Sequence, residues 1–261
     1  MTKRNFLFAP TDPDAATTRL IATAASATGF MKGEPGPARP GWYVHGADNR
    51  AMLTELRDQL ALSYPEAGAP LWAVRLWTNL LWQPAYLAVI SVHLHGAVPD
   101  LTGLSQQRRG IYIDGFRLVP QPMVTASPEA MIDLAATQLK ALAGEMLVAV
   151  NALEKLRPIA AKRLFADRML GLMVWLGQRR RDLTLEEIEA YADRWLDQLD
   201  LTGQGQLERV STGQRTLLIT RRKGCCLDYL IDPDRLCANC PRQDPHLRIA
   251  RQTANALAES P

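Results

Sequence analysis

Residues 70–96 read PLWAVRLWTNLLWQPAYLAVISVHLHG, an almost continuously apolar stretch in which Arg75 is the only formally charged side chain. Asn79, Gln83 and Pro84 interrupt the apolar run, which therefore falls short of the roughly 18 consecutive apolar residues of a membrane-spanning helix. The stretch thus predicts a buried core helix. Because proline lacks the N–H that a helix interior uses, we expect this helix to be kinked or split at Pro84.

Start signals for further helices precede this core segment. Asp12 followed by Pro13 combines an N-cap with a first-turn proline and predicts a helix over 12–28. Leucines and a methionine at helical spacing predict a second helix over about 47–63, with Leu62 on its inner side.

Four more helices are predicted after the core segment. A serine before a proline predicts a helix over 127–156, and a second proline opens the next over 158–178. Thr184 and Glu187 form a capping box that begins a third helix. The last helix begins near the Asp-Pro pair at 244–245.

Turn signals predict short strands between these helices. The pair Asp114-Gly115, flanked by apolar residues, predicts a β-hairpin near 110–119. A second hairpin is predicted over 205–222, turning at Thr212-Gly213. The Pro- and Gly-rich run over 33–40 predicts a surface loop.

The predicted fold class is mostly α (α+β). We expect a helical body over residues 1–204 that contains the hairpin near 110–119 and binds the substrate. A carboxyl-terminal segment over 205–261 contains all the cysteines and is expected to bind metal.

The composition is that of an ordinary globular protein. Of the 261 residues, 47% are hydrophobic and 22% are charged, which excludes a disordered chain. The formal net charge of +3 is too small to indicate nucleic-acid binding. The first residues contain only four consecutive apolar ones, too few for a signal-peptide core. We therefore expect a cytoplasmic protein that does not span a membrane and whose thiols stay reduced.

The four cysteines stand close together near the carboxyl end as Cys225-Cys226, ten residues, then Cys237-Ala238-Asn239-Cys240. A Cys-x-x-Cys turn brings two thiolates to the same side of the chain and thus to one metal. Adjacent cysteines point to opposite faces of an extended strand, so Cys225 and Cys226 converge only where the backbone turns. Gly224 is expected to supply that conformational freedom.

The cysteine spacing leaves three kinds of site open. An iron–sulfur cluster suits an adjacent pair because two irons offer attachment points farther apart than one ion does, although the spacing differs from the plant-type pattern. A tetrahedral zinc site and redox-active or merely structural thiols are the alternatives.

Basic residues flank the cysteines: Arg221, Arg222 and Lys223 precede them and Arg242 follows. Cations beside an anionic cluster would favour its reduced form and raise its potential. The alternative is that these side chains form a solvated strand edge.

Two histidines near the end of the core segment are weaker candidates. On a strand, His93 and His95 would share a face and could contact a metal or ligand, whereas on a helix they would not. The alternative is a helix end with one histidine buried and the other in contact with water.

The cysteine segment resembles a known family. Arg221-Arg222-Lys223-Gly224-Cys225-Cys226-Leu227-Asp228-Tyr229, followed by Cys237-Ala238-Asn239-Cys240-Pro241, is similar to the carboxyl-terminal signature of the FhuF-like ferric iron–siderophore reductases. Gly224 departs from the small polar residue expected there, which affects one local hydrogen bond to the cluster. The resemblance over the rest of the chain has no distinctive motif.

The resemblance implies a [2Fe–2S] cluster on Cys225, Cys226, Cys237 and Cys240, through which single electrons reach siderophore-bound iron(III) and release iron(II). No nucleotide or flavin motif is present, since Gly203-Gln204-Gly205 is not a dinucleotide fingerprint. We therefore expect electrons from a partner such as a ferredoxin or a ferredoxin reductase.

Six residues are candidate contacts for the siderophore or the donor: Arg221, Arg222, Lys223, Arg242, His45 and Trp42. The alternative function is a non-catalytic siderophore-binding or accessory module that zinc or a cluster stabilises.

Overall fold

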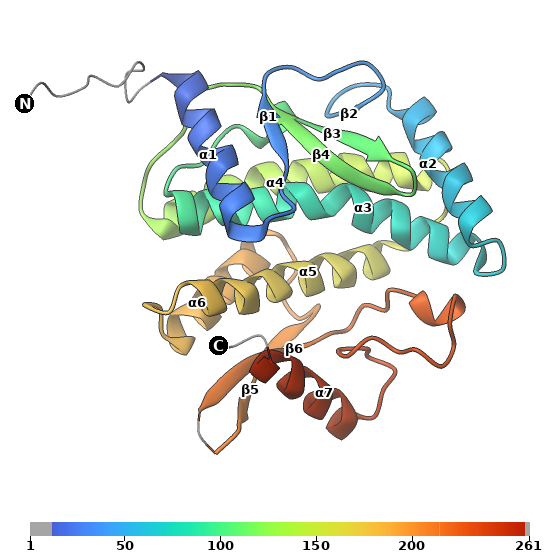
Figure 1. Ribbon diagram of the computed structural model, residues 1–261, viewed down its shortest axis with the longest axis vertical. Coiled ribbons are helices and arrows are strands. Elements are labelled where there is room, and N and C mark those ends of the chain that lie inside the picture. The colour runs from blue at the N-terminus through green and yellow to red at the C-terminus, as the bar shows by residue number, and fades with distance from the viewer. Residues whose placement is uncertain (1–11, 214, 259–261) are drawn as a thin grey trace, which may run out of the picture.

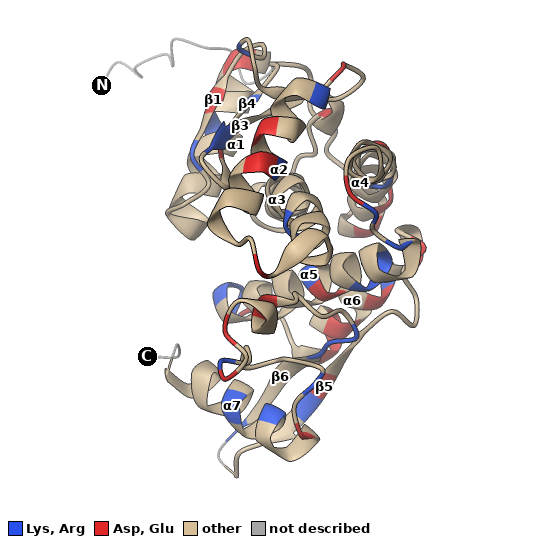
Figure 2. Ribbon diagram, turned by 90° about the vertical axis from the view of Figure 1, so that its right-hand side faces the viewer, with Lys and Arg blue, Asp and Glu red and all other residues tan. Residues whose placement is uncertain are grey.

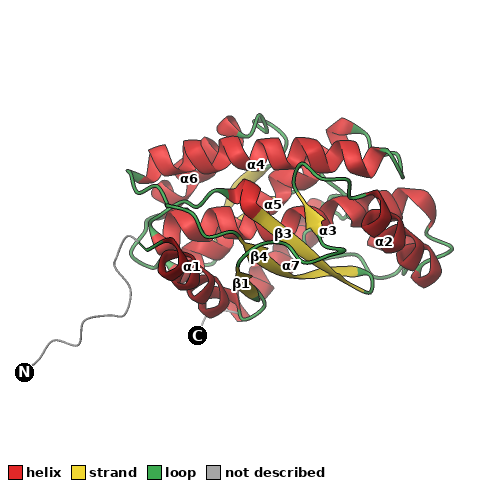
Figure 3. Cartoon of the chain, turned by 90° about the horizontal axis from the view of Figure 1, so that it is seen from above, coloured by secondary structure: helices red, strands yellow, loops and turns green. Residues whose placement is uncertain are grey.

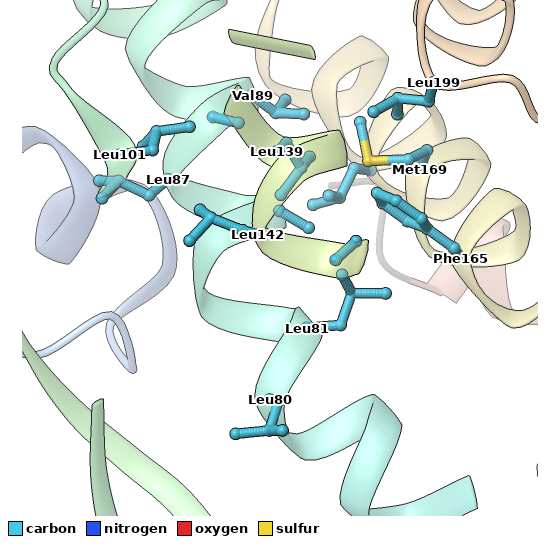
Figure 4. Packing of buried hydrophobic residues seen from close by; sticks show 14 of the residues in the cluster. Leu80, Leu81, Leu87, Val89, Leu101, Leu139, Leu142, Phe165, Met169 and Leu199 are labelled. Carbon is cyan, nitrogen blue, oxygen red and sulfur yellow. The ribbon is translucent and has the colours of Figure 1, made fainter. Parts of the chain in front are cut away.

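Three long helices form the centre of the fold. In the computed structural model, which describes residues 12–213 and 215–258, α3 (Gly68–Ile90) packs on both α4 (Pro128–Asn151) and α5 (Pro158–Arg179) (Figure 1). Their leucines, with Phe165 and Met169, fill the space between them (Figure 4). The first residues, used above to predict the location of the protein in the cell, lie outside the described part.

The core helix α3 passes through Pro84 without a break, so the predicted split is wrong. Proline leaves the carbonyl of Leu80, one turn earlier, without its helical N–H donor. The buried amide of Gln106 donates to that carbonyl at 2.9 Å and takes the place of the missing donor. A side chain from a strand thus permits a proline inside a helix. Beyond Ile90, the chain continues as a π-helical turn, Ser91–His95.

A four-stranded sheet lies above α3, with α1 (Pro13–Thr28) and α2 (Arg50–Ser63) at its two ends (Figure 3). The strand order is β1-β4-β3-β2, with β1 parallel to β4 and the other pairs antiparallel. The strands are β1 (Gly33–Pro35), β2 (Tyr43–Val44), β3 (Leu104–Arg109) and β4 (Tyr112–Leu118).

Two predictions about this sheet are wrong. The hairpin turns at Gly110 and Ile111, whereas Asp114-Gly115 lies inside β4. The Pro- and Gly-rich run does not form only a loop, because Gly33 to Pro35 pairs with Phe116 to Leu118 of β4. Strand pairing overrides the local turn signal in both places: β4 pairs with β3 along the Asp114-Gly115 region, and β1 pairs with the distant β4.

Local capping signals are confirmed at three helix starts. Asp12 accepts the N–H of Asp14 at 3.0 Å in front of α1, and Ser127 accepts that of Ala130 at 3.3 Å in front of α4. The capping box with Thr184 begins α6 (Leu185–Gln198). The predicted ends are less accurate: α4 ends at Asn151 rather than near 156, and Leu62 of α2 is 75% exposed instead of inward-facing.

The carboxyl-terminal part lies against the opposite face of α5 from the sheet (Figure 1). It consists of the hairpin β5 (Gln206–Ser211) and β6 (Thr216–Arg221), a short 3-10 turn (Asp228–Leu230) and α7 (Pro245–Ala258). The fold is therefore mostly α with two small sheets, as predicted. Within the described ranges, no helix has the length and apolar character needed to cross a membrane.

The two histidines near the end of α3 belong to the core and its edge. His93 is 6% exposed, and its Nε2 accepts the indole N–H of Trp195 at 3.0 Å. The half-buried His95 lies 3.3 Å from the hydroxyl of Thr23. Burial lowers the pKa of His93 to about 4, with a further lowering by Arg180, so this ring is neutral.

Candidate iron–sulfur centre

The segment that leads into the cysteines is fastened to α5 by one buried carboxylate. Asp167, whose side chain is 3% exposed, accepts the backbone N–H of Gly224 at 2.8 Å and that of Lys223 at 3.2 Å. The Arg222 guanidinium adds a third bond, from Nε at 3.1 Å. Burial raises the pKa of Asp167, and Arg222 opposes that shift.

Gly224 is required by the close approach of this segment to α5. A Cβ atom there would lie 2.7 Å from Asp167 Oδ2 and 2.9 Å from the backbone nitrogen of Leu164. Gly224 is not among the residues with positive φ, so the predicted need for conformational freedom is wrong. The site that needs a left-handed backbone is Leu227, with φ at 63°.

The left-handed Leu227 directs two successive backbone N–H groups at sulfur atoms. Its own N–H donates to Cys225, and the N–H of Asp228 donates to Cys226. Such a turn makes a concavity that favours anions. Both hydrogen bonds favour the thiolate form; at Cys225, however, burial outweighs this effect and raises the pKa of the thiol.

The sulfur atoms of Cys226 and Cys237, which come from the two halves of the motif, lie 3.9 Å apart. Two thiolates on one tetrahedral metal with metal–sulfur bonds of about 2.3 Å would lie about 3.8 Å apart. The hydrogen bond with Cys237 lowers the pKa of Cys226 to about 6 and raises the pKa of Cys237. Cys225 and Cys240 are close enough to each other and to this pair to interact electrostatically.

The thiols of Cys225-Cys226 and of Cys237–Cys240 therefore lie close to one another. Cys240 is buried, and the other three cysteines are partly exposed. Among residues 12–213 and 215–258, no three His, Cys, Asp or Glu side chains are placed as joint ligands of a single ion. A [2Fe–2S] cluster takes four thiolates, shared between two irons. The pair spacing, the sulfur-directed N–H groups and the nearby guanidinium of Arg222 fit that anionic group.

Hydrogen bonds from Gln243 and from Arg251 of α7 stabilise the backbone of the Cys237–Cys240 turn. The side-chain amide of Gln243 donates to the carbonyl of Cys237 at 2.6 Å. The guanidinium of Arg251 in α7 donates to Gln243 Oε1 at 2.5 Å and to the carbonyl of Leu236 at 2.9 Å. The helix after the motif thus fixes the backbone that presents these two thiols.

Arg222 connects both halves of the motif. Besides Asp167, it donates to Asn239 Oδ1 at 3.1 Å, inside the Cys-x-x-Cys turn. Its charge also acts on the sulfur atoms of Cys226 and Cys237. With a side chain only 15% exposed, Arg222 lies inside the site rather than on a solvated strand edge.

The other basic candidates, Arg221, Lys223 and Arg242, lie at the exposed edge of the cysteine site. Arg242 stacks on the Tyr229 ring, 4.1 Å from its centroid, and its charge acts on Cys225. The ammonium group of Lys223 donates to the carbonyl of Gly203 at 2.7 Å. Arg221 ends β6 as an exposed side chain. Further Lys and Arg residues mark β5 and α7 (blue in Figure 2).

The structure does not bring His45 and Trp42 to the cysteines. His45 pairs with Glu145 of α4 at 2.5 Å, and the guanidinium of Arg39 lies 5.9 Å from the Trp42 ring centroid. Both residues flank β2, on the sheet side of α3, whereas the cysteines lie on the opposite side of the molecule (Figure 1).

Two further contacts at the site were not predicted from the sequence. Asp167 is one of many acidic residues on a helix, and its role depends on a partner 57 positions away. Arg75 is the only charge of the apolar core segment, and its guanidinium pairs with Asp228 at 2.6 Å. An isolated charge in a core helix is the one feature that could have marked a long-range partner.

A cavity of about 630 Å³ opens beside Cys225. Its walls come from the beginning of α3, the connection between α4 and α5, and the segment from Lys223 to Leu227. Of the four cysteines, Cys225 is the one that lines it. A ligand in this cavity would contact the cysteine site directly.

Comparison with known families identifies the cysteine segment. Residues 222–242 match the family model of the FhuF 2Fe-2S C-terminal domain, and the cysteines at 225, 226, 237 and 240 fit its motif. The segment is thus a [2Fe–2S]-binding domain of the FhuF type. No solved structure matches the chain.

Proposed function

We propose that this protein is a cytoplasmic ferric-siderophore reductase, with Cys225, Cys226, Cys237 and Cys240 as the four ligands of its [2Fe–2S] cluster. The observation that carries the proposal is the cavity of about 630 Å³ whose wall contains Cys225 of the FhuF-type segment. A substrate-sized space next to a cluster ligand suits an enzyme better than a module in which the cluster is only structural.

The bound cluster supplies single electrons, one for each iron(III) reduced to iron(II), while the donor protein is oxidised by the same amount. The chain holds the thiolates in place through Asp167, Gly224 and Arg222. The Arg222 cation stabilises the added negative charge of the reduced state. Iron(II) binds siderophores far more weakly than iron(III), so reduction releases the metal.

The electron donor is proposed to be a ferredoxin or a ferredoxin reductase. Arg221 and Arg242, at the exposed edge of the cysteine site, are basic and suit an acidic protein partner. The partition into a body over 1–204 and a cluster segment over 205–261 is part of the same proposal, since the hairpin and α7 hold the cysteines while α3, α4 and α5 form the core.

The first test is the metal content of the purified protein. We expect two irons and two sulfides per chain and visible charge-transfer bands that bleach with dithionite. Stoichiometric zinc without sulfide would support the non-catalytic, zinc-stabilised module instead.

The second test separates cluster ligation from substrate binding. Cys237→Ser should remove the cluster, since serine is a harder and poorly ionised ligand. The core of α3, α4 and α5 contains none of the cysteines, so we expect the variant to stay folded and to bind the ferric siderophore without reducing it. The readouts are tryptophan-fluorescence titration and iron(II) trapped by a chromogenic chelator. Iron(II) release at the parental rate by a cluster-free variant would refute the mechanism.

A further inference from the structure

The cavity beside Cys225 has cations around its opening. Four exposed basic residues line it, and we call them the rim: Lys155, Arg157, Arg163 and Lys223. The one acidic residue of the lining is Glu154, which pairs with Arg57 at 3.3 Å. The lining thus carries three net positive charges, as many as the formal net charge of +3 for the whole chain. The positive surplus of the protein is therefore concentrated at this opening.

The rim keeps its charge uncompensated. Within the described part of the chain, Lys155, Arg157 and Arg163 form no ion pair. The ammonium group of Lys223 donates to the carbonyl of Gly203, a neutral acceptor that does not cancel its charge. Unpaired exposed cations of this kind attract an anionic partner from a distance and raise its rate of association.

Exposed apolar side chains accompany these cations. Ile159 is 46% exposed, and Ala69 and Pro70 at the beginning of α3 are also exposed. All three line the same cavity as the rim. Protein–protein interfaces combine a patch of apolar side chains with polar or charged residues around it, so this surface has the composition of a docking site.

The opening leads directly to the cysteines. Because Cys225 lines the cavity, no further layer of protein separates a partner at the rim from a cluster ligand. Electron transfer between two proteins requires this kind of close approach. A membrane surface is flat on this scale and would touch the cations without approaching Cys225, so the hollow shape favours a protein partner.

We propose that the rim is the docking surface for the electron donor, an acidic one-electron carrier of the ferredoxin type, and that the donor and the ferric complex occupy this opening in turn. The inference rests on the function proposed above and names the place where its donor binds. Lys223 stands two positions from Arg221, so the rim continues the exposed edge of the cysteine site.

The alternation follows from the position of the rim. A donor seated on it covers the cavity in which the ferric complex is proposed to bind, so the two partners exclude one another. In the first half-reaction one reduced donor loses one electron to the protein and leaves. In the second, one iron(III) gains that electron and leaves as iron(II).

Binding of an oxidised plant-type ferredoxin, an acidic protein, tests the docking surface without turnover. In calorimetric titrations of the cluster-loaded protein at low salt, Arg157→Gln with Arg163→Gln should weaken binding at least about tenfold, a difference of about 1.4 kcal/mol. Parental affinity should fall as salt rises, because exposed charges are screened beyond about 10 Å at 0.1 M. Unchanged affinity in the double variant would overturn the inference.

A matched control separates the rim from the net charge of the protein. Arg50→Gln with Arg181→Gln removes the same number of charges from α2 and from the residues after α5, and ferredoxin affinity should stay at the parental value. Equal weakening in both double variants would overturn the assigned surface. Unchanged visible bands show that each variant retains its cluster. If the rim variant loses only binding to phosphatidylserine vesicles, the rim is a membrane contact and the inference is wrong.

Steady-state kinetics test the alternation. Reduced ferredoxin and an iron(III) trihydroxamate, each varied at fixed levels of the other, should give the parallel double-reciprocal lines of a ping-pong reaction. Oxidised ferredoxin, added as product, should inhibit competitively against the iron(III) complex, because both occupy the same opening. Competition with reduced ferredoxin alone would place the donor and the ferric complex at separate sites and contradict the alternation.

The outcomes separate this inference from the function on which it rests. If the parental protein reduces iron(III) complexes while the rim variant binds ferredoxin normally, the reductase stands and the docking surface is wrong. If ferredoxin binding follows the prediction but neither ferredoxin nor dithionite supports reduction of an iron(III) complex, the docking surface stands and the proposed function fails.

Discussion

The carboxylate of Asp167 and the backbone N–H of Gly224 meet at 2.8 Å, although 57 positions separate them in the sequence. This contact joins the central helix α5 to the residue immediately before the first cysteine. Because Gly224 has no side chain, the backbone of the cysteine segment can approach the backbone of α5 closely. The buried carboxylate of Asp167 can then accept the backbone N–H groups of Gly224 and Lys223.

The first prediction is that Asp167→Asn loosens the cysteine segment. The change leaves the largely buried Arg222 without its counter-charge, and breaking such a pair costs about 3–5 kcal/mol. We expect iron to be lost to a chelator at least about tenfold faster, with faster exchange of the Lys223 and Gly224 amide protons. Asp133→Asn, which removes a half-exposed partner of Arg194, is the control and should change neither rate. Equal chelation rates for both variants would argue against the anchoring role of Asp167.

The second prediction concerns Gly224→Ala. The added methyl would overlap Asp167 Oδ2 and the backbone of α5, so the segment must move at a cost of about 1–3 kcal/mol. Iron and sulfide per chain should fall after purification. Gly144→Ala in α4 is the matched control, because its added carbon has no atom within 4 Å apart from the neighbouring backbone of its own helix, and it should retain full iron content. A fully loaded Gly224→Ala protein would show that the close approach is not needed.

The third prediction is a pH dependence of stability that originates at His93. The pKa of His93 is about 4 in the folded state, below the value of about 6.5 in the unfolded chain. Between these values the unfolded state binds more protons, so stability falls as the pH falls. The expected loss between pH 7 and 5 is about 2 kcal/mol.

Chemical denaturation of the parental protein and of His93→Gln at both pH values measures this effect. The glutamine variant should be less sensitive to pH, because it has no ring to protonate. His246→Gln, which removes an exposed histidine, should keep the parental sensitivity. The same pH slope in the His93 variant and the parent would assign the effect to other groups.

The fourth prediction couples Gln106 to Pro84. Gln106→Leu should destabilise the protein by about 1–3 kcal/mol, because it leaves the Leu80 carbonyl without a donor. In a Pro84→Ala background the helix regains its own N–H, so the same change should cost about 1 kcal/mol less. A double-mutant cycle by denaturation measures the difference. Strict additivity would mean that Gln106 does not compensate for the proline.

Local chemistry allowed much of the architecture to be predicted from the sequence. Asp12, Ser127 and Thr184 each cap a helix within three residues of themselves, so their effect does not depend on the rest of the fold. The turn at Gly110 and the strand at Gly33–Pro35 were missed, because each depends on pairing along β4. Gly33–Pro35 pairs with residues far away in the chain, and the position of the turn depends on the register of β3 against β4.

The sequence alone determined the chemistry of the site, since four thiols at the spacing of Cys225, Cys226, Cys237 and Cys240 match the motif of one family of [2Fe–2S] domains. Only the tertiary structure decided which partners surround those thiols. Asp167 and Arg163 belong to a helix that precedes the motif by more than 40 positions, and nothing in their local sequence marks them. Their roles arise from the packing of that helix against the cysteine segment, which buries one side chain as an anchor and leaves the other at the rim of a cavity.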